Sequence, residues 1–199
     1  METFKMQKFS EFEFRTQPWF QQSAIQRFAR NLIPMKTLVI YCLDPRATEI
    51  PEAVAAYFGD EVYPGELVLD EEGHRIGSTR TLFTETNAGG RAEAALQSIV
   101  TMKYLFDVQN VVVVHHSFCG ASAITPDVLI DEFKHEHHSD ISDLFDRESL
   151  SIPDFEKSLE YDVKLLRSSP AVPQHVKLYG FFYEINTGKL VEVVRDIPE

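Results

Sequence analysis

The chain has 199 residues, of which 44% are hydrophobic and 25% charged, so it is long enough and apolar enough to form one buried core. Its formal net charge of −12 argues against nucleic acid and anionic membranes as partners, because both attract positively charged surfaces. No apolar run approaches the ~20 residues needed to cross a bilayer, and positions 1–20 contain no continuous apolar stretch of the kind that a secretory signal has. Acidic residues in the same segment fit poorly with a transit peptide, so we expect a cytoplasmic protein.

The first elements in chain order are a helix and a buried strand. Residues Ser23–Leu32 carry apolar side chains at helical spacing, and Pro34 ends this pattern. We therefore expect residues 1–34 to form an N-terminal helical arm that packs on the body of the domain or on a second subunit. Thr37–Tyr41 is a short, continuous apolar run, which is typical of a strand buried on both faces of a parallel sheet.

Two further apolar runs, Val111–Val114 and Val176–Phe182, have the same character. Gly90–Phe106 lies before the first of them and carries a helical apolar stripe. Strand, helix and strand in this order predict an α/β domain over residues 35–199, with a central, mostly parallel β-sheet flanked by helices. The remaining expected elements are short strands within Glu66–Leu69 and Thr81–Thr86, a helix at Ile152–Leu166, and a turn at Thr187-Gly188 before a closing strand, Leu190–Arg195.

Both cysteines of the chain follow predicted buried strands. Cys42 comes directly after the first strand, and Cys119 follows the valine run, with His116 three residues before it. The carboxyl ends of parallel strands are where ligands bind, so these side chains are expected at one edge of the sheet. A Cys₂His set leaves the fourth position of a tetrahedral zinc ion open, as in catalytic sites, and its soft ligands favour zinc over magnesium or calcium. Ordinary buried cysteines are the alternative, which the shared placement at strand ends disfavours.

The residues around these three positions form two short motifs. Cys42-Leu43-Asp44-Pro45-Arg46 fits C-x-D-x-R, and His116-Ser117-Phe118-Cys119-Gly120 fits H-x-x-C-G, with Asn87-Ala88-Gly89-Gly90 between them. In this order the motifs resemble the β-carbonic anhydrase family, over most of the chain from about Met35 onward. The His115-His116 doublet is similar to the compact microbial branch, near which the carbonyl sulfide hydrolases lie.

The resemblance implies one zinc ion per chain, held by Cys42, His116 and Cys119, with Asp44 and Arg46 as the catalytic dyad beside it. It implies hydration of carbon dioxide to bicarbonate by a zinc-bound hydroxide, which forms because the metal lowers the pKa of a bound water towards ~7. In some family members the aspartate instead binds the zinc and closes the site. The family also implies a homodimer or a dimer of dimers.

Asn87, Ala88 and Gly89 are expected to line the substrate pocket, although a turn at the start of a helix explains them equally well. Lys134–Asp140 contains three histidines, and a charged, solvated helix end explains this segment better than a metal site. It could also relay protons, since histidine titrates near neutrality.

Two departures from the family pattern leave the substrate open. Thr86 stands where the family often has arginine, and Phe118 stands where a small or acidic residue is usual. Both changes make the surroundings of the metal less polar, which suits carbonyl sulfide, split to carbon dioxide and hydrogen sulfide, at least as well as carbon dioxide. A catalytically silent zinc-binding structural or regulatory protein is the alternative from another class, and the intact Asp44 and Arg46 speak against it.

Overall fold

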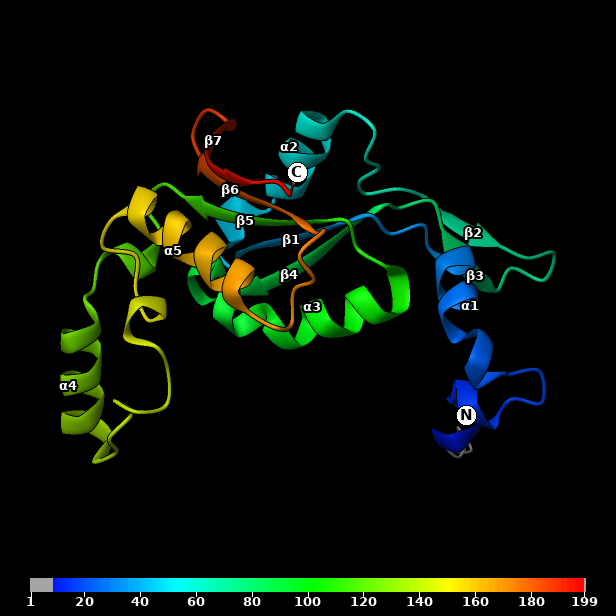
Figure 1. The fold of residues 1–199 in the computed structure, drawn as a ribbon, viewed down its shortest axis with the longest axis horizontal. Coiled ribbons are helices and arrows are strands. Elements are labelled where there is room, and N and C mark those ends of the chain that lie inside the picture. Colours follow the sequence, from blue (N-terminus) through cyan, green and yellow to red (C-terminus); the bar gives the residue numbers. More distant parts are fainter. Residues whose placement is uncertain (1–8, 199) are drawn as a thin grey trace, which may run out of the picture.

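The structure is a computed structural model that describes residues 9–198 (Figure 1). Its strands are β1 (Thr37–Cys42), β2 (Leu67–Leu69), β3 (Arg75–Ser78), β4 (Leu82–Asn87), β5 (Asn110–His116), β6 (Lys177–Glu184) and β7 (Lys189–Asp196). Its α-helices are α1 (Ile25–Leu32), α2 (Ile50–Phe58), α3 (Ala92–Phe106), α4 (Pro126–His137) and α5 (Phe155–Ser168). Within residues 9–198, none of the helices has the length and apolar character that crossing a membrane requires.

The central sheet has five strands in the order β4-β1-β5-β6-β7. The first four run parallel, and β7 pairs with β6 in the antiparallel direction after the turn at Thr187-Gly188. The expected α/β fold with a mostly parallel sheet flanked by helices is therefore confirmed. Because parallel strands end at the same edge, the segments that follow β1, β4 and β5 meet there.

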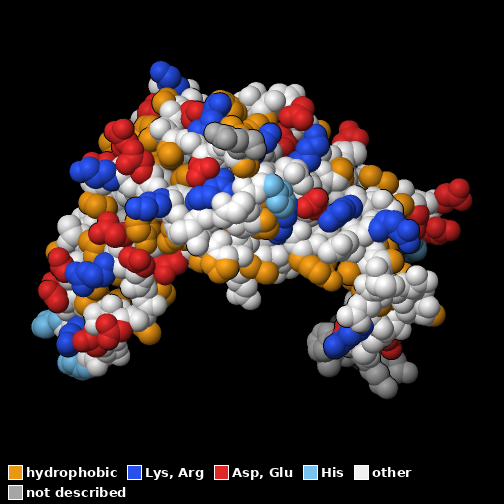
Figure 2. Space-filling view, in the orientation of Figure 1, with side chains coloured by type: hydrophobic (Ala, Val, Ile, Leu, Met, Phe, Trp, Pro, Cys, Tyr) orange, Lys and Arg blue, Asp and Glu red, His pale blue; other side chains and the backbone are white. Residues whose placement is uncertain are grey.

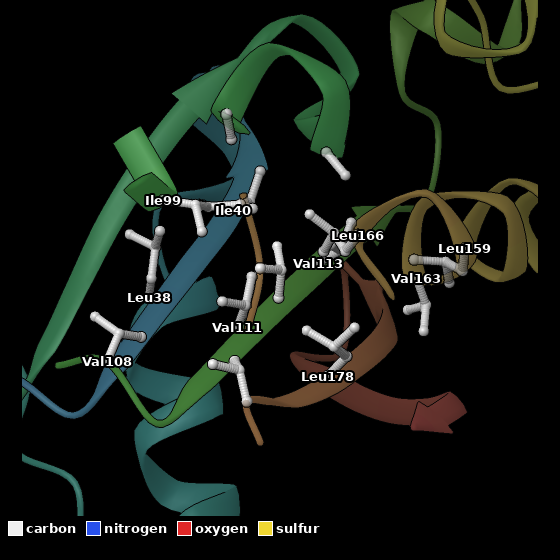
Figure 3. Close-up of a cluster of buried hydrophobic side chains, with 14 of the residues drawn as sticks. Leu38, Ile40, Ile99, Val108, Val111, Val113, Leu159, Val163, Leu166 and Leu178 are labelled. Atoms are coloured by element: carbon white, nitrogen blue, oxygen red, sulfur yellow. The ribbon is translucent and has the colours of Figure 1, made fainter. Parts of the chain in front are cut away.

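Side chains of the central strands alternate between two buried faces. One face is formed by Leu38, Ile40, Val111, Val113 and Leu178, which pack with Ile99 of α3 and with Leu159, Val163 and Leu166 of α5 (Figure 3). The other is formed by Val39, Tyr41, Val112, Val114 and Phe181, which pack with Ile50 and Val54 of α2. Strands that are covered on both faces consist of continuous apolar residues, and this is why β1 and β5 could be predicted from the sequence.

Two projections extend from opposite ends of the body (Figure 1). One contains α1 and a separate antiparallel hairpin of β2 and β3, and the other contains α4. The predicted helix at Ser23–Leu32 is present as α1 after a short 3₁₀ turn, while the first eight residues of the predicted arm lie outside the described residues. Two elements, α2 and β3, were not predicted from the sequence. The residues of β3 are exposed or half-buried, so they leave no apolar alternation to detect.

The turn between β4 and α3 packs directly against the end of β1. Gly90 has a φ of +67°, and a Cβ atom at this position would lie 2.7 Å from the carbonyl carbon of Tyr41 and 2.8 Å from the amide nitrogen of Cys42. Only glycine has both the conformation and the space that this turn requires. The close approach therefore fixes where the turn lies relative to the last residue of β1.

We predict that Gly90→Ala destabilises the protein more than Gly73→Ala. Gly73 also has a left-handed φ of +84°, but no atom lies within 4 Å of its missing Cβ, so alanine there bears only the conformational cost of ~1–2 kcal/mol. At Gly90 the backbone of β1 must shift as well. Urea denaturation of both variants measures the difference, and equal losses of stability would contradict the close packing.

Candidate metal centre

The three predicted metal ligands lie together at the carboxyl edge of the sheet. Cys42 is the last residue of β1, His116 is the last residue of β5, and these strands are parallel neighbours. Cys119 follows after Phe118, whose left-handed φ of +56° turns the chain back towards the site. One ligand atom from each of the three residues lies within 4.8 Å of the others, and all three residues are buried.

The donor atoms suit a tetrahedral metal ion. The Sγ atoms of Cys42 and Cys119 are 3.8 Å apart and form no disulfide; two sulfurs bound at about 2.3 Å to a tetrahedral zinc have a separation of ~3.8 Å. The Nδ1 of His116 lies 2.9 Å from the carbonyl oxygen of Ser117, so this nitrogen carries the proton and donates. The other nitrogen, Nε2, is buried and has no hydrogen-bond partner among the described residues. A buried nitrogen lone pair that has no hydrogen-bond partner is available to coordinate a metal ion.

The protonation of the two cysteines also favours metal binding. The pKa of Cys42 is lowered to about 4, first because Cys119 donates a hydrogen bond to its sulfur, and further by the backbone amides of Asp44 and Gly89. The pKa of Cys119 is raised because it is the partner of that thiolate and because it is buried. One thiolate, the form that binds metals, is therefore present at neutral pH.

Asp44 and Arg46 form an ion pair at the rim of this site. Arg46 Nε lies 3.0 Å from Asp44 Oδ1, and Arg46 NH2 lies 2.6 Å from Oδ2 and 3.0 Å from the carbonyl oxygen of Phe118. The hydrogen bonds from Arg46 hold the pKa of Asp44 well below its usual range. Asp44 Oδ2 is also 3.9 Å from His116 Nε2, so the ionised carboxylate lies beside the donor atoms.

Comparisons with known proteins agree with this geometry, although no protein-family model matches the chain. The chain is 27% identical to β-carbonic anhydrase 1 of Mycobacterium tuberculosis over 135 residues, which cover 67% of this chain and 74% of the relative. A crystal structure of carbonic anhydrase from Streptococcus mutans superposes with a TM-score of 0.59 at 25% identity, over 95% of this chain and 99% of that one. The resemblance to the β-carbonic anhydrase family is confirmed.

A second enzyme within this resemblance acts on a sulfur compound. Carbon disulfide hydrolase of Acidithiobacillus thiooxidans is 24% identical over 119 residues, which cover 52% of this chain and 60% of the relative. A solved carbon disulfide hydrolase shares the fold with a TM-score of 0.56 at 19% identity, over 86% of this chain and 85% of that one. The relatives of the chain are therefore enzymes of more than one specificity.

The rim of the site is apolar as well as charged. Phe118 is 70% exposed and Leu43 is 62% exposed, and each is a direct neighbour in sequence of a candidate ligand. Phe118 holds a left-handed backbone conformation that is uncommon for a bulky residue, and it lies in the turn that carries Cys119. The sequence analysis singled out Phe118 as a departure from the pattern of the β-carbonic anhydrases.

Asn87, Ala88 and Gly89 lie at the same edge of the sheet, but they differ in what they contact. Asn87 pairs with Cys42 in the register of β4 and β1, and its side chain closes the turn through hydrogen bonds of 2.7 and 3.1 Å with the backbone of Arg91. Asn87 and Ala88 line a cavity of about 410 Å³ whose other walls include Leu129 of α4. Gly89 acts through its amide, which hydrogen-bonds to the Cys42 sulfur.

A buried polar cluster near the candidate ligands was not predicted from the sequence. Asp162 of α5 is fully buried and contacts both Arg91, which precedes α3, and His115 of β5. Burial lowers the pKa of His115, against the effect of the nearby carboxylate. A signal was present in the sequence, because Asp162 interrupts an apolar helical stripe that includes Leu159 and Leu166.

The histidine-rich segment is exposed, as expected for a charged helix end. α4 ends at His137, and residues 134–140 are all exposed to solvent. One further group of potential metal ligands in residues 9–198, Asp70, Glu72 and His74, lies at the half-buried to exposed tip of the β2–β3 hairpin. Neither group approaches the burial of the Cys₂His set.

A carboxylate also fixes the segment between His116, at the end of β5, and Cys119. Glu184, at the end of β6, accepts hydrogen bonds from the backbone amides of Thr187 and Asn186 at 2.8 and 3.0 Å and from the hydroxyl of Ser117 at 3.3 Å. Thr187 and Asn186, with a smaller effect of Ser117, lower the pKa of Glu184 to about 2. Ser117 is therefore held in place next to His116.

We predict that Glu184→Gln destabilises the protein at neutral pH and that the difference from the parent shrinks in acid. The folded pKa is depressed, so the carboxylate contributes stability above its unfolded pKa of ~4.3, and this contribution is lost as the pH falls towards about 2. Denaturant unfolding of both proteins at a series of pH values tests this. Glu160→Gln, on the exposed side of α5, is the control. A difference that does not change with pH would contradict the assignment.

Proposed function

We propose that this chain is a zinc enzyme that hydrates carbon dioxide to bicarbonate, with one zinc ion per chain bound by Cys42, His116 and Cys119. The observation that carries the proposal is the set of three buried donor atoms, including the unpartnered Nε2 of His116, beside an intact Asp44–Arg46 pair. When bound, zinc supplies a Lewis acid that lowers the pKa of a coordinated water to ~7. The resemblance to the β-carbonic anhydrases supports the same reaction.

Asp44 orients the attacking water. Its Oδ2 lies close to the position that His116 Nε2 faces, so it can accept a hydrogen bond from a water there and direct the oxygen lone pair towards the substrate carbon. Because Arg46 keeps the pKa of Asp44 well below its usual range, the carboxylate does not retain the proton, which passes to solvent. Asp44 is therefore an orienting acceptor that stays ionised through the reaction.

Arg46 keeps Asp44 in this role. Its guanidinium holds both carboxylate oxygens and is itself tied to the carbonyl of Phe118, so it restrains Asp44 from rotating towards the metal ligands. Leu43 and Phe118 give the rim an apolar surface that suits a small, linear, uncharged substrate. We propose that Asn87, Ala88 and Gly89 border the substrate pocket beside this rim.

The first test combines metal content with turnover. We expect about one zinc per chain, the stoichiometry of a mononuclear catalytic site, and hydration of carbon dioxide that is lost in Cys42→Ala, because that variant lacks one of three ligands. Metal analysis and stopped-flow hydration assays provide the measurements. Zinc without turnover of either carbon dioxide or carbonyl sulfide would indicate the catalytically silent zinc protein, and a chain without zinc would overturn the metal site.

A second candidate function is hydrolysis of a sulfur-bearing substrate at the same site. Two observations favour it: the exposed, apolar Phe118 and Leu43 at the rim, and the similarity to a carbon disulfide hydrolase. Carbonyl sulfide is linear, uncharged and more polarisable than carbon dioxide, and the same ionised Asp44 can orient a water to attack it. The ratio of turnover on carbon dioxide to turnover on carbonyl sulfide, measured on one preparation, distinguishes the two functions.

We predict that Asp44→Asn lowers kcat/KM by ~10²-fold or more, in the range by which positioned proton-transfer groups accelerate reactions. The matched control is Asp140→Asn. Asp140 also has a pKa held low by a basic partner, Lys134, but it lies on the exposed segment after α4. Steady-state kinetics of both zinc-loaded variants provide the test, and equal effects of the two substitutions would contradict the role of Asp44.

We further propose that residues 1–34 act as an arm in a homo-oligomer, a dimer or a dimer of dimers, while residues 35–199 form the zinc domain. Phe14 and Trp19 of the arm are more than half exposed, and with Ile76 of the hairpin they line an apolar groove of about 640 Å³. Hydrophobic side chains also gather along the concave surface between the two projections (Figure 2). A second copy that covers this surface would bury it. The two unpaired, buried cysteines are consistent with the cytoplasmic location that we propose.

A further inference from the structure

A single carboxylate lies behind all three candidate ligands. Asp162 is fully buried on α5. Its Oδ1 accepts a hydrogen bond from Arg91 NH2 at 3.2 Å, while its Oδ2 lies 3.1 Å from Arg91 Nε and 3.1 Å from His115 Nε2. The Arg91 side chain is only 4% exposed. The proposed reaction involves neither the carboxylate of Asp162 nor the guanidinium of Arg91, so this buried ion pair requires a separate explanation.

The first connection runs from Asp162 through Arg91 to Cys42. The backbone of Arg91 closes the turn on the side chain of Asn87, and this turn presents the Gly89 amide to the Cys42 sulfur. The turn is also pressed against β1 at Gly90. A displacement of Arg91 therefore moves a hydrogen-bond donor of the first thiolate.

The second connection runs through His115 to His116. Because a carboxylate only accepts hydrogen bonds, His115 Nε2 donates to Asp162, which fixes the strand residue directly before the histidine ligand. β5 alternates its side chains, so His115 and His116 face opposite sides of the sheet and share one stretch of backbone. Anchoring His115 to α5 therefore fixes the direction from which His116 reaches the site.

The third connection reaches Cys119. Arg91 NH1 donates to the carbonyl oxygen of Ser151, and the next residue, Ile152, donates its amide to the carbonyl of Ala121 at 2.9 Å. The Ala121 amide in turn hydrogen-bonds to the Cys119 sulfur. Ile152 packs with both cysteines in one buried cluster. The Arg91 guanidinium thus links Asp162 to the surroundings of the Cys119 sulfur.

We propose that Asp162 is a positioning residue that, through Arg91 and His115, sets the arrangement of the three zinc ligands; this rests on the proposed zinc function. A buried ion pair contributes little net stability, because the cost of desolvating two charges is close to the gain from pairing them. Groups that orient metal ligands from behind do affect the metal, and their loss typically weakens metal binding by ~10–100-fold. Through the hydrogen bonds of Arg91 and His115, the single carboxylate of Asp162 is connected to all three candidate ligands.

The test compares Asp162→Asn and Arg91→Lys with Arg167→Lys. Arg91→Lys keeps the charge and loses the fork that reaches both Asp162 and Ser151. Arg167 is the matched control, because it lies on α5 and also joins a carboxylate, that of Asp196, to backbone carbonyls, those of Gln174 and Val176. Full-length proteins are examined by zinc competition with a chromophoric chelator, by the visible spectrum of the cobalt-substituted form, and by thermal unfolding.

We expect zinc affinity to fall by ~10–100-fold in Asp162→Asn and Arg91→Lys, with a changed cobalt spectrum, and to stay at the parental value in Arg167→Lys even where the Tm of that control falls. Parental zinc affinity and an unchanged spectrum in both test variants would overturn the proposal, whatever their Tm. If Asp162→Asn does not fold, Arg91→Lys decides alone.

Failure of the proposed function gives a different pattern. A parent chain that binds neither zinc nor cobalt overturns the function and the role of Asp162 together. A parent that binds zinc, with affinity dependent on Asp162, but turns over neither carbon dioxide nor carbonyl sulfide overturns only the catalytic function.

Discussion

The parallel pairing of β1 with β5 is the contact on which the candidate site depends. Cys42 and His116 are separated by more than 70 positions in the sequence, and they meet because their strands are neighbours that end at the same edge. The pairing is itself held by two apolar layers, since each strand alternates its side chains between the α3–α5 face and the α2 face. The hydrophobic effect therefore brings the soft ligands together, and the polar groups refine their positions.

Two aspartate–arginine pairs serve this edge of the sheet under different physical conditions. Asp44 and Arg46 lie at the rim, where the arginine side chain is 54% exposed and solvent screens the charges. This pair can contact water and substrate while its two side chains stay paired. Asp162 and Arg91 are buried, so breaking their contact leaves an unpaired charge in an apolar environment, at a high free-energy cost. The buried pair is consequently suited to holding geometry, and the exposed pair to contacting reactants.

The sequence predicted the parts of this fold that depend on local patterns. Continuous apolar runs identified β1 and β5, and two short motifs placed the three ligands and the Asp44–Arg46 pair at one edge. α2 escaped prediction because Ile50–Phe58 follows a polar loop and carries a proline in its first turn, and β3 because its residues are largely exposed. The Asp162 cluster escaped because it joins three elements whose contacts arise only on folding. Its one local sign was a charged residue within an apolar stripe of α5.

The charge of the chain and the polarity of the rim act together on the choice of substrate. A net charge of −12 produces a field that repels anions and has little effect on an uncharged molecule. The apolar side chains of Phe118 and Leu43 lie beside the charged dyad. A linear neutral molecule is weakly hydrated, so contact with these side chains costs it little free energy of desolvation. An anionic product such as bicarbonate is disfavoured by the same field and the same apolar rim. The same surface properties thus favour entry of a neutral substrate in both candidate reactions, and departure of the charged product in the hydration of carbon dioxide.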